Sequence, residues 1–564
     1  MLPPPSGTLL VAWIVLALVL VGLGTLVRRL GRVPAAAGTD PFLDFWTGWA
    51  ALTVVLEAWH LVLPIDTGAL AFVASLGLLG LATDGRRPWR ALVRGARAHP
   101  FVVAAVLVAA LWLSRLCLAG ARNGDSGYYH FPIMRWAATF PAVPGLVNLF
   151  PFLAYNQSFL LYATVVNVGP LAQAGNHVAN GILVLALLAR CTLGLARAVQ
   201  ADASGAPADL YYALLLPAAF GLAFDINLTS PSPDLAVFAL EAVLCGALVA
   251  FLTERRDAPA RRLAAACALL ATVGVTVKLS FAGLAAAVLP LVLVVVMRRA
   301  ASARAALTVI VLATLAVVPW VVHGVVLSGY PLYPSPVMPL PVVWRAPLAA
   351  TIAQGNAIRE WNGVADAWRV ALGDPRWFAG LLGTLGWTQR DVLLALAIVA
   401  VALPVAAGRC VWTRRVPVLA LALVPTVAGL VFVFVAAPQA RFAGALPWVL
   451  AAESVLLVAS WNGAGRRRAR TVLAGVAVAL AALHLRDGPV FRRDLAGFEG
   501  LPSPELREVR IVDERAVHVP VPSDQCWDAP PPCTPVPNRA LRLRREGDLG
   551  AGFVIDGNVE PGPP

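Results

Sequence analysis

Charged residues are scarce in this chain, and their scarcity argues against a soluble fold. Only 13% of the 564 residues are charged, whereas 59% are hydrophobic. A soluble domain carries about a quarter charged residues, and a single aqueous core stops growing near about 250–300 residues. So many apolar side chains do not fit into one such core, and the composition predicts an integral membrane protein.

The sequence motifs of several enzyme classes are also missing. The chain has no P-loop, no H-E-x-x-H and no protein-kinase signature. It contains only seven His, none of them paired at the spacing of metal ligands. These absences argue against a cytoplasmic ATPase. We expect no cofactor, and leave open a divalent metal.

Long apolar runs are abundant. Runs of about 20 residues, the length that crosses the hydrocarbon as a helix, recur along the chain. They predict an all-α polytopic membrane protein with about fourteen transmembrane helices, at residues 9–27, 43–63, 67–83, 100–119, 177–199, 209–225, 234–252, 263–277, 279–297, 305–326, 391–407, 416–437, 442–460 and 471–485. The first run is long enough to span, and no positive charge precedes it, so we expect no cleavable signal peptide.

Arginine clusters between these runs indicate the topology. Clusters follow the first, third, seventh, ninth, eleventh and thirteenth predicted spans, as at Arg28–Arg29 and Arg255–Arg256. Positive clusters stay in the cytoplasm, which places both termini outside the inner membrane of a bacterium. The net charge of +13 is thus attributed to topology, with anionic membrane lipids, not nucleic acid, as the partners of the basic turns.

One further apolar segment does not fit this pattern. Residues 156–171 are apolar enough to span, but counting them would move later arginine clusters to the opposite side. We therefore expect residues 132–170 to form amphipathic or re-entrant structure on the outer face.

Three parts are expected along the chain. They are N-terminal transmembrane helices at 1–99, a transmembrane core at 100–485 with outer loops 121–176 and 328–390, and an extracytoplasmic tail at 486–564.

The tail differs from the rest in composition. It is charged and rich in Pro, with β-like stretches at Val509–Val512 and Val517–Val521. Cys526 and Cys533 have no further zinc ligands near them, so a disulfide is expected. A disulfide belongs in an oxidising compartment, which agrees with an external tail.

The first outer loop contains the most unusual polar motif, Asn-Gly-Asp-Ser-Gly-Tyr-Tyr-His at residues 123–130. Asp125 is a candidate catalytic carboxylate that accepts a proton from a substrate hydroxyl. Tyr128, Tyr129 and His130 are candidates for binding sugar or phosphate. The alternative for Asp125 is a turn or capping residue in a Gly-rich loop.

Three charged residues near other outer turns complete the candidate set. Asp234 enters a predicted helix, where it either caps the helix or joins Asp125 in a composite site. Lys278 lies between two apolar runs and either holds a lipid phosphate or snorkels to the interface. Arg441 is the only charge in a short outer turn, so it either binds phosphate or pairs with Asp125 or Asp234.

Two tyrosines open the second large outer loop. Tyr330 and Tyr333 lie in Ser-Gly-Tyr-Pro-Leu-Tyr-Pro-Ser. Both are candidates for stacking on a sugar ring, or for the aromatic belt found at any membrane interface.

Taken together, these residues resemble the GT-C superfamily of membrane glycosyltransferases. Such enzymes have many spans and an acidic residue in the first large outer loop, matched here by Asp125 with the aromatic residues Tyr128–His130. The resemblance implies a GT-C-like helical bundle and a sugar donor linked to polyprenyl phosphate or diphosphate on the outer membrane face.

The chain is also similar to an uncharacterised group of bacterial GT-C-like membrane proteins. The shared hallmarks cover about residues 120–555 and are Asp125–His130, Pro144–Asn148, Ser230–Leu235, Lys278, Gly329–Ser335, Pro438–Phe442, Gln525–Asp528 and Pro532–Pro535.

The chain departs from the GT-C pattern in two respects. Ser126 follows Asp125, where many members have a second acidic residue, which argues against a metal-assisted mechanism. Three or four spans also precede this loop, whereas the family has one.

We therefore expect a glycosyltransferase in which Asp125 activates or orients the acceptor, while Lys278 and Arg441 hold the carrier phosphate. One alternative is a transporter or flippase for a lipid-linked or polymeric substrate, with Glu241 and Glu453 as its main buried polar groups. The other is a protein that kept the fold without the activity.

Overall fold

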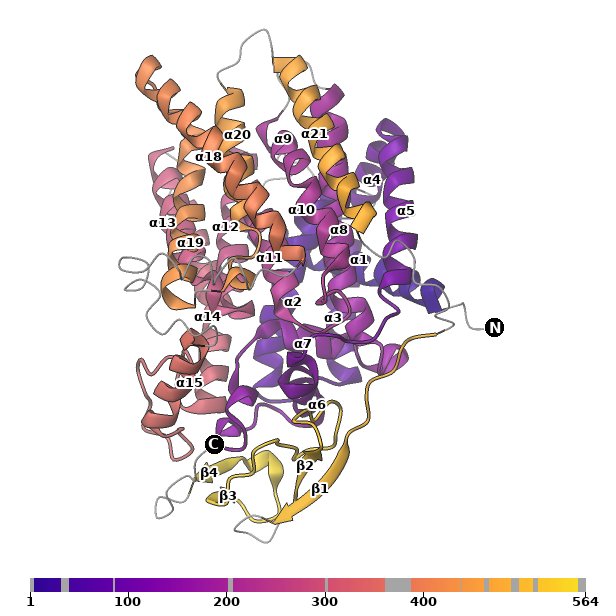
Figure 1. Cartoon of the computed structure of the whole chain (residues 1–564), viewed down its shortest axis with the longest axis vertical. Helices are drawn as coiled ribbons and strands as arrows, with labels where there is room; N and C mark the ends of the chain where they lie inside the picture. The colour runs from indigo at the N-terminus through magenta and orange to yellow at the C-terminus, as the bar shows by residue number, and fades with distance from the viewer. Residues whose placement is uncertain are drawn as a thin grey trace.

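The computed structural model describes residues 5–31, 40–84, 87–200, 206–299, 303–360, 387–437, 439–460, 466–487, 497–510 and 516–555. Residues 361–386 of the expected second outer loop lie outside this set. Among the described residues, long helices make up one part of the molecule, and short helices and four strands make up the other (Figure 1).

The α-helices are α1 (Pro5–Leu30), α2 (Pro41–His60), α3 (Thr67–Asp84), α4 (Arg87–Ala98), α5 (Pro100–Leu116), α6 (Phe131–Thr139), α7 (Ser158–Val165), α8 (Gly175–Gln200), α9 (Pro207–Leu214), α10 (Leu216–Gly221), α11 (Pro233–Thr253), α12 (Asp257–Val277), α13 (Ala282–Arg298), α14 (Ala303–Ser328), α15 (Leu348–Glu360), α18 (Trp387–Thr413), α19 (Leu423–Ala436), α20 (Leu446–Ser460) and α21 (Arg466–Asp487). A short π-helix, η2 (Ser126–His130), leads into α6. The strands are β1 (Glu505–Arg510), β2 (Ala516–Val521), β3 (Leu541–Leu543) and β4 (Phe553–Ile555).

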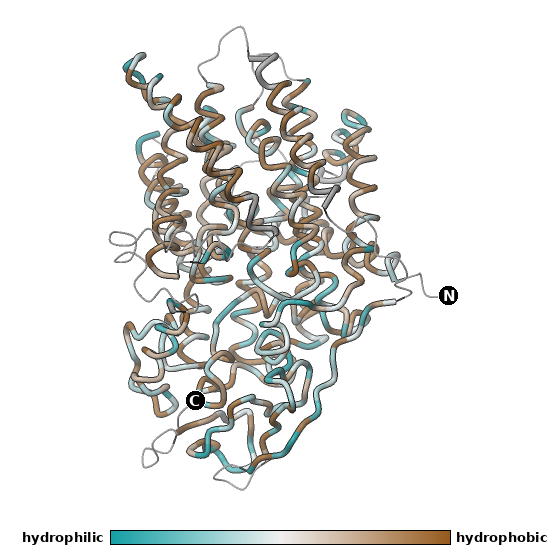
Figure 2. Tube along the Cα trace, in the orientation of Figure 1, coloured by the Kyte–Doolittle hydropathy of each residue, from teal (hydrophilic) through white to brown (hydrophobic). Residues whose placement is uncertain are grey.

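Eight helices among the described residues are long and apolar enough to cross a membrane, or up to ten if each of two bent helix pairs is one span. The pairs are α4 with α5, bent by 103°, and α9 with α10, bent by 42°. Hydrophobic residues predominate along the long helices in Figure 2, whereas the part with α6, α15 and the strands is mixed. The chain is therefore a helical membrane protein, and the higher count of fourteen spans stays a prediction.

The segment at residues 156–171 does not span. Its helix α7 has eight residues, about 12 Å of helix. All eight residues are buried. A helix lying on the membrane surface would expose one face, so the amphipathic alternative is wrong for α7. It is a short helix enclosed by the protein.

Several arginine clusters lie together at one end of the bundle. Arg262 at the start of α12 is 2.7 Å from Asp44 at the start of α2, and Arg28 near the end of α1 is 3.5 Å from the same carboxylate. At the ends of α13 and α11, Arg299 donates to the carbonyl of Phe251. We call this the arginine end. The expected grouping of the clusters is confirmed for these helices.

The other end of the bundle holds the candidate site. Helix α12 has 21 residues, about 30 Å of helix. Arg262 lies in its first two turns, at the arginine end, and Lys278 lies just past its last residue. The first outer loop, the strands and α15 gather at this end (Figure 1). We call it the cavity end.

The tail forms two small antiparallel sheets. Strand β1 pairs with β2 so that Glu505 faces Val521, and β3 pairs with β4 so that Leu541 faces Ile555. The expected β-stretch at Val517–Val521 is confirmed within β2, and residues 511–512 of the other stretch lie outside the described part.

The buried carboxylate of Asp44 gives the first prediction. Its side chain is 2% exposed between two guanidinium groups, so Asp44→Ala removes a carboxylate that balances buried positive charge. We expect the free energy of unfolding to fall by about 3–5 kcal/mol, measured by reversible denaturation in mixed detergent micelles.

Asp40→Ala is the matched control for that change. Asp40 is exposed and caps α2 by accepting from the amide of Phe42, so its loss costs about 1 kcal/mol. Equal destabilisation by both variants would show that the Asp44 charge contributes nothing beyond a cap.

Candidate functional site

The Asp125 loop is held by hydrogen bonds to the turn before α11. Ser230 accepts from the amide of Asn123 at 3.2 Å, and the Asn123 side chain donates to Asn227 at 2.6 Å. Asn123 also accepts from the amide of Asp125 at 2.9 Å. Asp125 therefore stands at the start of η2 in a fixed backbone, and the structure gives its side chain no capping hydrogen bond.

The Ser-Pro turn at residues 229–233 has a supporting role. Asn180 of α8 donates to the carbonyls of Asn227, Ser230 and Ser232, and Asn176 donates to that of Thr229. Two buried amides thus hold an irregular turn that would otherwise leave buried carbonyls without donors.

Asp234 is not the cap of its helix. The N-cap of α11 is Ser232, whose hydroxyl accepts from the amide of Asp234 at 3.3 Å. The side chain of Asp234 instead accepts a hydrogen bond from Lys278, with which it forms an ion pair. The capping alternative is therefore wrong, and the carboxylate serves to compensate a cation.

Lys278 and Arg441 meet at a single aromatic ring. The ammonium of Lys278 is 4.2 Å from the centroid of the Phe442 ring, and the guanidinium carbon of Arg441 is 4.8 Å from it. Arg441 also donates to Asp125 across 3.4 Å. Asp125, Lys278 and Arg441 therefore converge, and the pairing of Arg441 with Asp125 is confirmed.

A buried carboxylate fixes the turn that carries Arg441. Glu241 of α11 is 0% exposed, and it accepts from the amide of Ala445 at 2.6 Å. The preceding Gly444 has φ = 50°, and a Cβ there would lie 2.3 Å from the Glu241 carboxylate. A glycine is required at this position by both its backbone and its neighbour.

These side chains line one open cavity with an empty volume of about 1450 Å³, its mouth included. Its polar wall includes Asp125, Tyr128, Tyr129, Lys278 and Arg441. Tyr333, Tyr155 and Arg359 of α15 also line it, whereas its apolar wall includes Leu279, Phe432 and Ala436. The cavity is therefore amphiphilic, with charge at one side and hydrocarbon at the other.

Three candidates do not line this cavity. Asp234 acts through Lys278, and Tyr330 is fully buried with its hydroxyl donating to the carbonyl of Ala346 at 3.1 Å. His130 is 1% exposed. Burial lowers the pKa of His130 to about 3; Asp234 opposes this shift, and Lys278 and Arg441 add to it. At neutral pH it is an uncharged buried ring. Neither His130 nor Tyr330 is among the residues that line the cavity, so their contact with a ligand stays a prediction.

An aromatic cluster forms the floor of the cavity. The ring centroids of Tyr128 and Phe152 are 5.0 Å apart, and those of Tyr129 and Tyr155 are 5.5 Å apart. Burial raises the pKa of Tyr128, with Asp524 and Asp125 adding to the shift. Its hydroxyl therefore stays protonated at neutral pH and is available as a hydrogen-bond donor.

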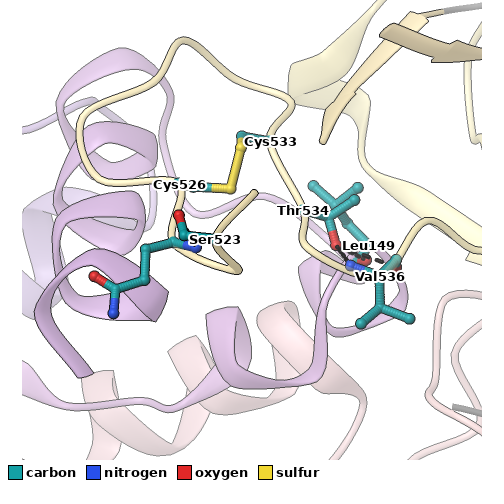
Figure 3. The surroundings of a disulfide bond; sticks show 7 residues. Leu149, Ser523, Cys526, Cys533, Thr534 and Val536 are labelled. Atoms are coloured by element: carbon teal, nitrogen blue, oxygen red, sulfur yellow. Dashed lines mark hydrogen bonds between the residues drawn. A yellow bond between two sulfur atoms is a disulfide. The ribbon is translucent and has the colours of Figure 1, made fainter. Parts of the chain in front are cut away.

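The tail packs directly on this first loop. The amide of Trp527 donates to the carbonyl of Gly127 at 2.9 Å, and a Cβ on Gly127 would lie 2.4 Å from the Trp527 ring. The expected disulfide joins Cys526 and Cys533. Beside it, Thr534 donates to the carbonyl of Leu149 in the same loop (Figure 3).

Sequence reasoning did not identify several lining residues. Tyr155, Asn156 and Gln157 form a continuous part of the wall, and Gln354 of α15 donates to the Tyr155 hydroxyl at 2.6 Å. The available signal was the polar Tyr-Asn-Gln interruption of an apolar segment. Among the described residues, no cluster of three or more His, Cys, Asp or Glu is arranged to hold a metal ion.

Removal of the Glu241 carboxylate gives the second prediction. Glu241→Ala leaves the buried amide of Ala445 without its acceptor, which costs about 1–3 kcal/mol. Glu241→Gln keeps an acceptor, and we expect its unfolding midpoint in detergent to stay near that of the wild type. An Ala variant as stable as the Gln variant would contradict a supporting role for this hydrogen bond.

Comparisons with known proteins place the chain in a family. No curated protein matches it, and no solved structure matches it. A family model described as "Domain of unknown function (DUF8201)" matches residues 8–447. The matched region contains Asp125, Asp234, Lys278 and Arg441 and ends before α21 and the tail. Because the match covers most of its length, the chain belongs to the DUF8201 family.

Proposed function

We propose that the protein is a membrane glycosyltransferase of the GT-C type, which transfers a sugar from a polyprenyl-phosphate-type carrier to an acceptor. The convergence of Asp125, Lys278 and Arg441 on one amphiphilic cavity is the observation that carries this proposal. A lipid-linked sugar has the matching chemistry, with a charged phosphate, a polar sugar and a hydrocarbon chain.

The cavity walls suit the three parts of such a donor. Lys278 and Arg441 bind the phosphate, and the hydrocarbon begins along Leu279 and Phe432. Among the described lining residues, Arg359 adds a third cation against the single carboxylate Asp125. Positive charge in a site with low-dielectric walls favours an anionic ligand. Tyr128 and Tyr129 stack on, or donate to, the sugar.

The reaction follows from these positions. Asp125 takes the proton of the acceptor hydroxyl. The hydroxyl oxygen of the acceptor then bonds to the anomeric carbon of the sugar. The bond between that carbon and the carrier phosphate oxygen breaks, and its electron pair leaves with the phosphate. Lys278 and Arg441 stabilise the charge that develops on this leaving group.

The cavity end is assigned to the outer face of the bacterial inner membrane. Arginine-rich turns favour the cytoplasm, and Arg28, Arg262 and Arg299 gather at the opposite end. A disulfide at the cavity end agrees with an oxidising compartment. With fourteen spans, both termini lie outside and the tail covers the acceptor side.

The contacts of the two buried glutamates favour the enzyme over a transporter. Glu241 accepts from a backbone amide, and Glu453 accepts from the hydroxyl of Thr426 at 2.9 Å. Each supports a neighbouring helix, as expected of a structural group. A non-catalytic protein is the other alternative, since Ser126 follows Asp125 in place of a second acidic residue, and the carboxylate of Asp234 is paired with Lys278.

The third prediction concerns the proposed base. Asp125→Asn removes the proton acceptor, and general-base catalysis contributes about 10²–10⁴-fold. We expect sugar transfer to purified acceptor in membranes supplied with polyprenyl-phosphate sugar to fall by at least about 100-fold.

Asp66→Asn is the control for the loss of a carboxylate. Asp66 is exposed, accepts from the amide of Gly68 and does not line the cavity, and Asn can make the same turn. We expect unchanged turnover. Wild-type turnover by the Asp125 variant would remove that residue from the mechanism. Movement of the lipid-linked carrier across the vesicle membrane without sugar transfer would favour a flippase.

The fourth prediction concerns orientation. Ser503 is exposed in the tail, and Arg255 is exposed at the arginine end. In spheroplasts of cells that carry Ser503→Cys or Arg255→Cys, a membrane-impermeant maleimide should label only the first. Four of the five free native cysteines are buried, so Cys410→Ser is included as background. Labelling of Arg255→Cys alone would show that the topology is the opposite of the one proposed.

A further inference from the structure

A buried polar cluster lies behind the wall of the cavity. Nδ1 of His60 is 2.7 Å from Nε2 of His323, and Nδ1 of His323 is 2.8 Å from Oδ1 of Asn156. Glu57 is 1% exposed, and its Oε2 is 3.6 Å from His323. These residues come from α2, α14 and the segment before α7, and no sequence motif connects them.

The Asn156 amide has a defined orientation. Its Nδ2 donates to the carbonyl of Trp320 at 2.6 Å, while the Trp320 indole donates to the carbonyl of Asn156 at 2.7 Å. The amide oxygen must therefore face His323. Since an amide oxygen only accepts, Nδ1 of His323 carries a hydrogen.

The far ring of the pair is constrained in the same way. Nε2 of His60 is 3.1 Å from the carbonyl of Phe140. A carbonyl also only accepts, so Nε2 of His60 carries a hydrogen.

Each neutral imidazole has only one N–H, and both are now assigned to outward-facing bonds. The two remaining nitrogens, 2.7 Å apart, would then oppose lone pair to lone pair. One additional proton between them turns this repulsion into an N–H···N hydrogen bond. The pair then carries one positive charge, and the adjacent Glu57 is the only nearby carboxylate among the residues lining this chamber.

We propose that His60 and His323 share one additional proton, balanced by ionised Glu57, and that this proton positions Asn156 in the cavity wall. Asn156 lines the cavity together with Tyr155 and Gln157. The proton thus holds α2 and α14 to the segment that forms this wall. The cluster is a positioning device and makes no contact with the reacting atoms.

An alternative location of the same proton has a different consequence. If Glu57 holds it, Nδ1 of His323 has no hydrogen to donate, and the His323 Nε2–H donates to His60. The transfer moves one proton and leaves the total charge of the cluster unchanged. Asn156 then loses its donor, so the wall is held less firmly.

Few other titratable groups face this cluster. The small chamber around it is lined by apolar residues of α6 and α7, by Asn156 and Gln157, and by Tyr155. Across the wall, the charged residues are those of the cavity, namely Asp125, Lys278, Arg359 and Arg441. The cluster therefore gives up its proton as pH rises. The cavity wall at Asn156 is then held less firmly at higher pH.

Nitrogen-15 spectroscopy of the full chain tests where the proton lies. With only seven His in the sequence, the chain labelled on histidine in detergent should show one N–H proton coupled to nitrogens of two rings. The signal should vanish in His323→Gln and persist in His518→Gln, a residue of the tail. Two neutral rings with no shared proton between pH 5 and 8, a range typical of His titration, would overturn the proposal.

A second measurement tests the effect on the wall and needs no ligand. Hydrogen exchange of the peptide around residues 150–160 should accelerate at the pH where the shared proton is lost. Glu57→Gln removes the counter-charge, which should lower that pH by about one unit or more in both measurements. If the protection of this peptide against exchange did not change while the shared proton titrates, the positioning role would be contradicted.

Discussion

Charge at the cavity end of the bundle depends on a single helix for its placement. Helix α11 supplies Asp234 to Lys278 and Glu241 to the turn that carries Arg441. These acidic residues are seven positions apart, about two helical turns, so they project from the same face. An unpaired buried ion costs several kcal/mol. Asp234 therefore allows Lys278 to stand beside an apolar wall, while Glu241 fixes the turn from which Arg441 reaches Asp125.

Much of the helical framework was predictable. In a membrane the backbone N–H and C=O groups of an apolar run must bond within the segment, which a helix achieves. Two members of the site, Lys278 and Arg441, were predictable for the same reason, since both are conspicuous among apolar neighbours. The pairing of Lys278 with Asp234 was not, because it is set by how the helices pack. Asp234 occupies a typical capping position in sequence, yet Ser232 makes the cap and leaves the carboxylate free for Lys278.

Residues adjacent in sequence can also face different surroundings. Tyr129 lines the cavity while His130 does not, because successive residues of a helical turn point in different directions. The His60–His323 contact joins residues 263 positions apart, beyond the reach of any local pattern. Tyr155–Gln157 interrupt an apolar segment, but this short polar stretch does not by itself indicate which cavity the residues line.

The contact between Trp527 and Gly127 has a consequence for biosynthesis. The chain emerges from the ribosome with its N-terminal part first, so the first outer loop is inserted long before its partner is made. The amide that donates to the carbonyl of Gly127 belongs to Trp527, which is synthesised 400 residues later. Assembly of this protein therefore finishes only when the tail has folded against this loop, and a chain whose tail has not yet folded has an unfinished loop.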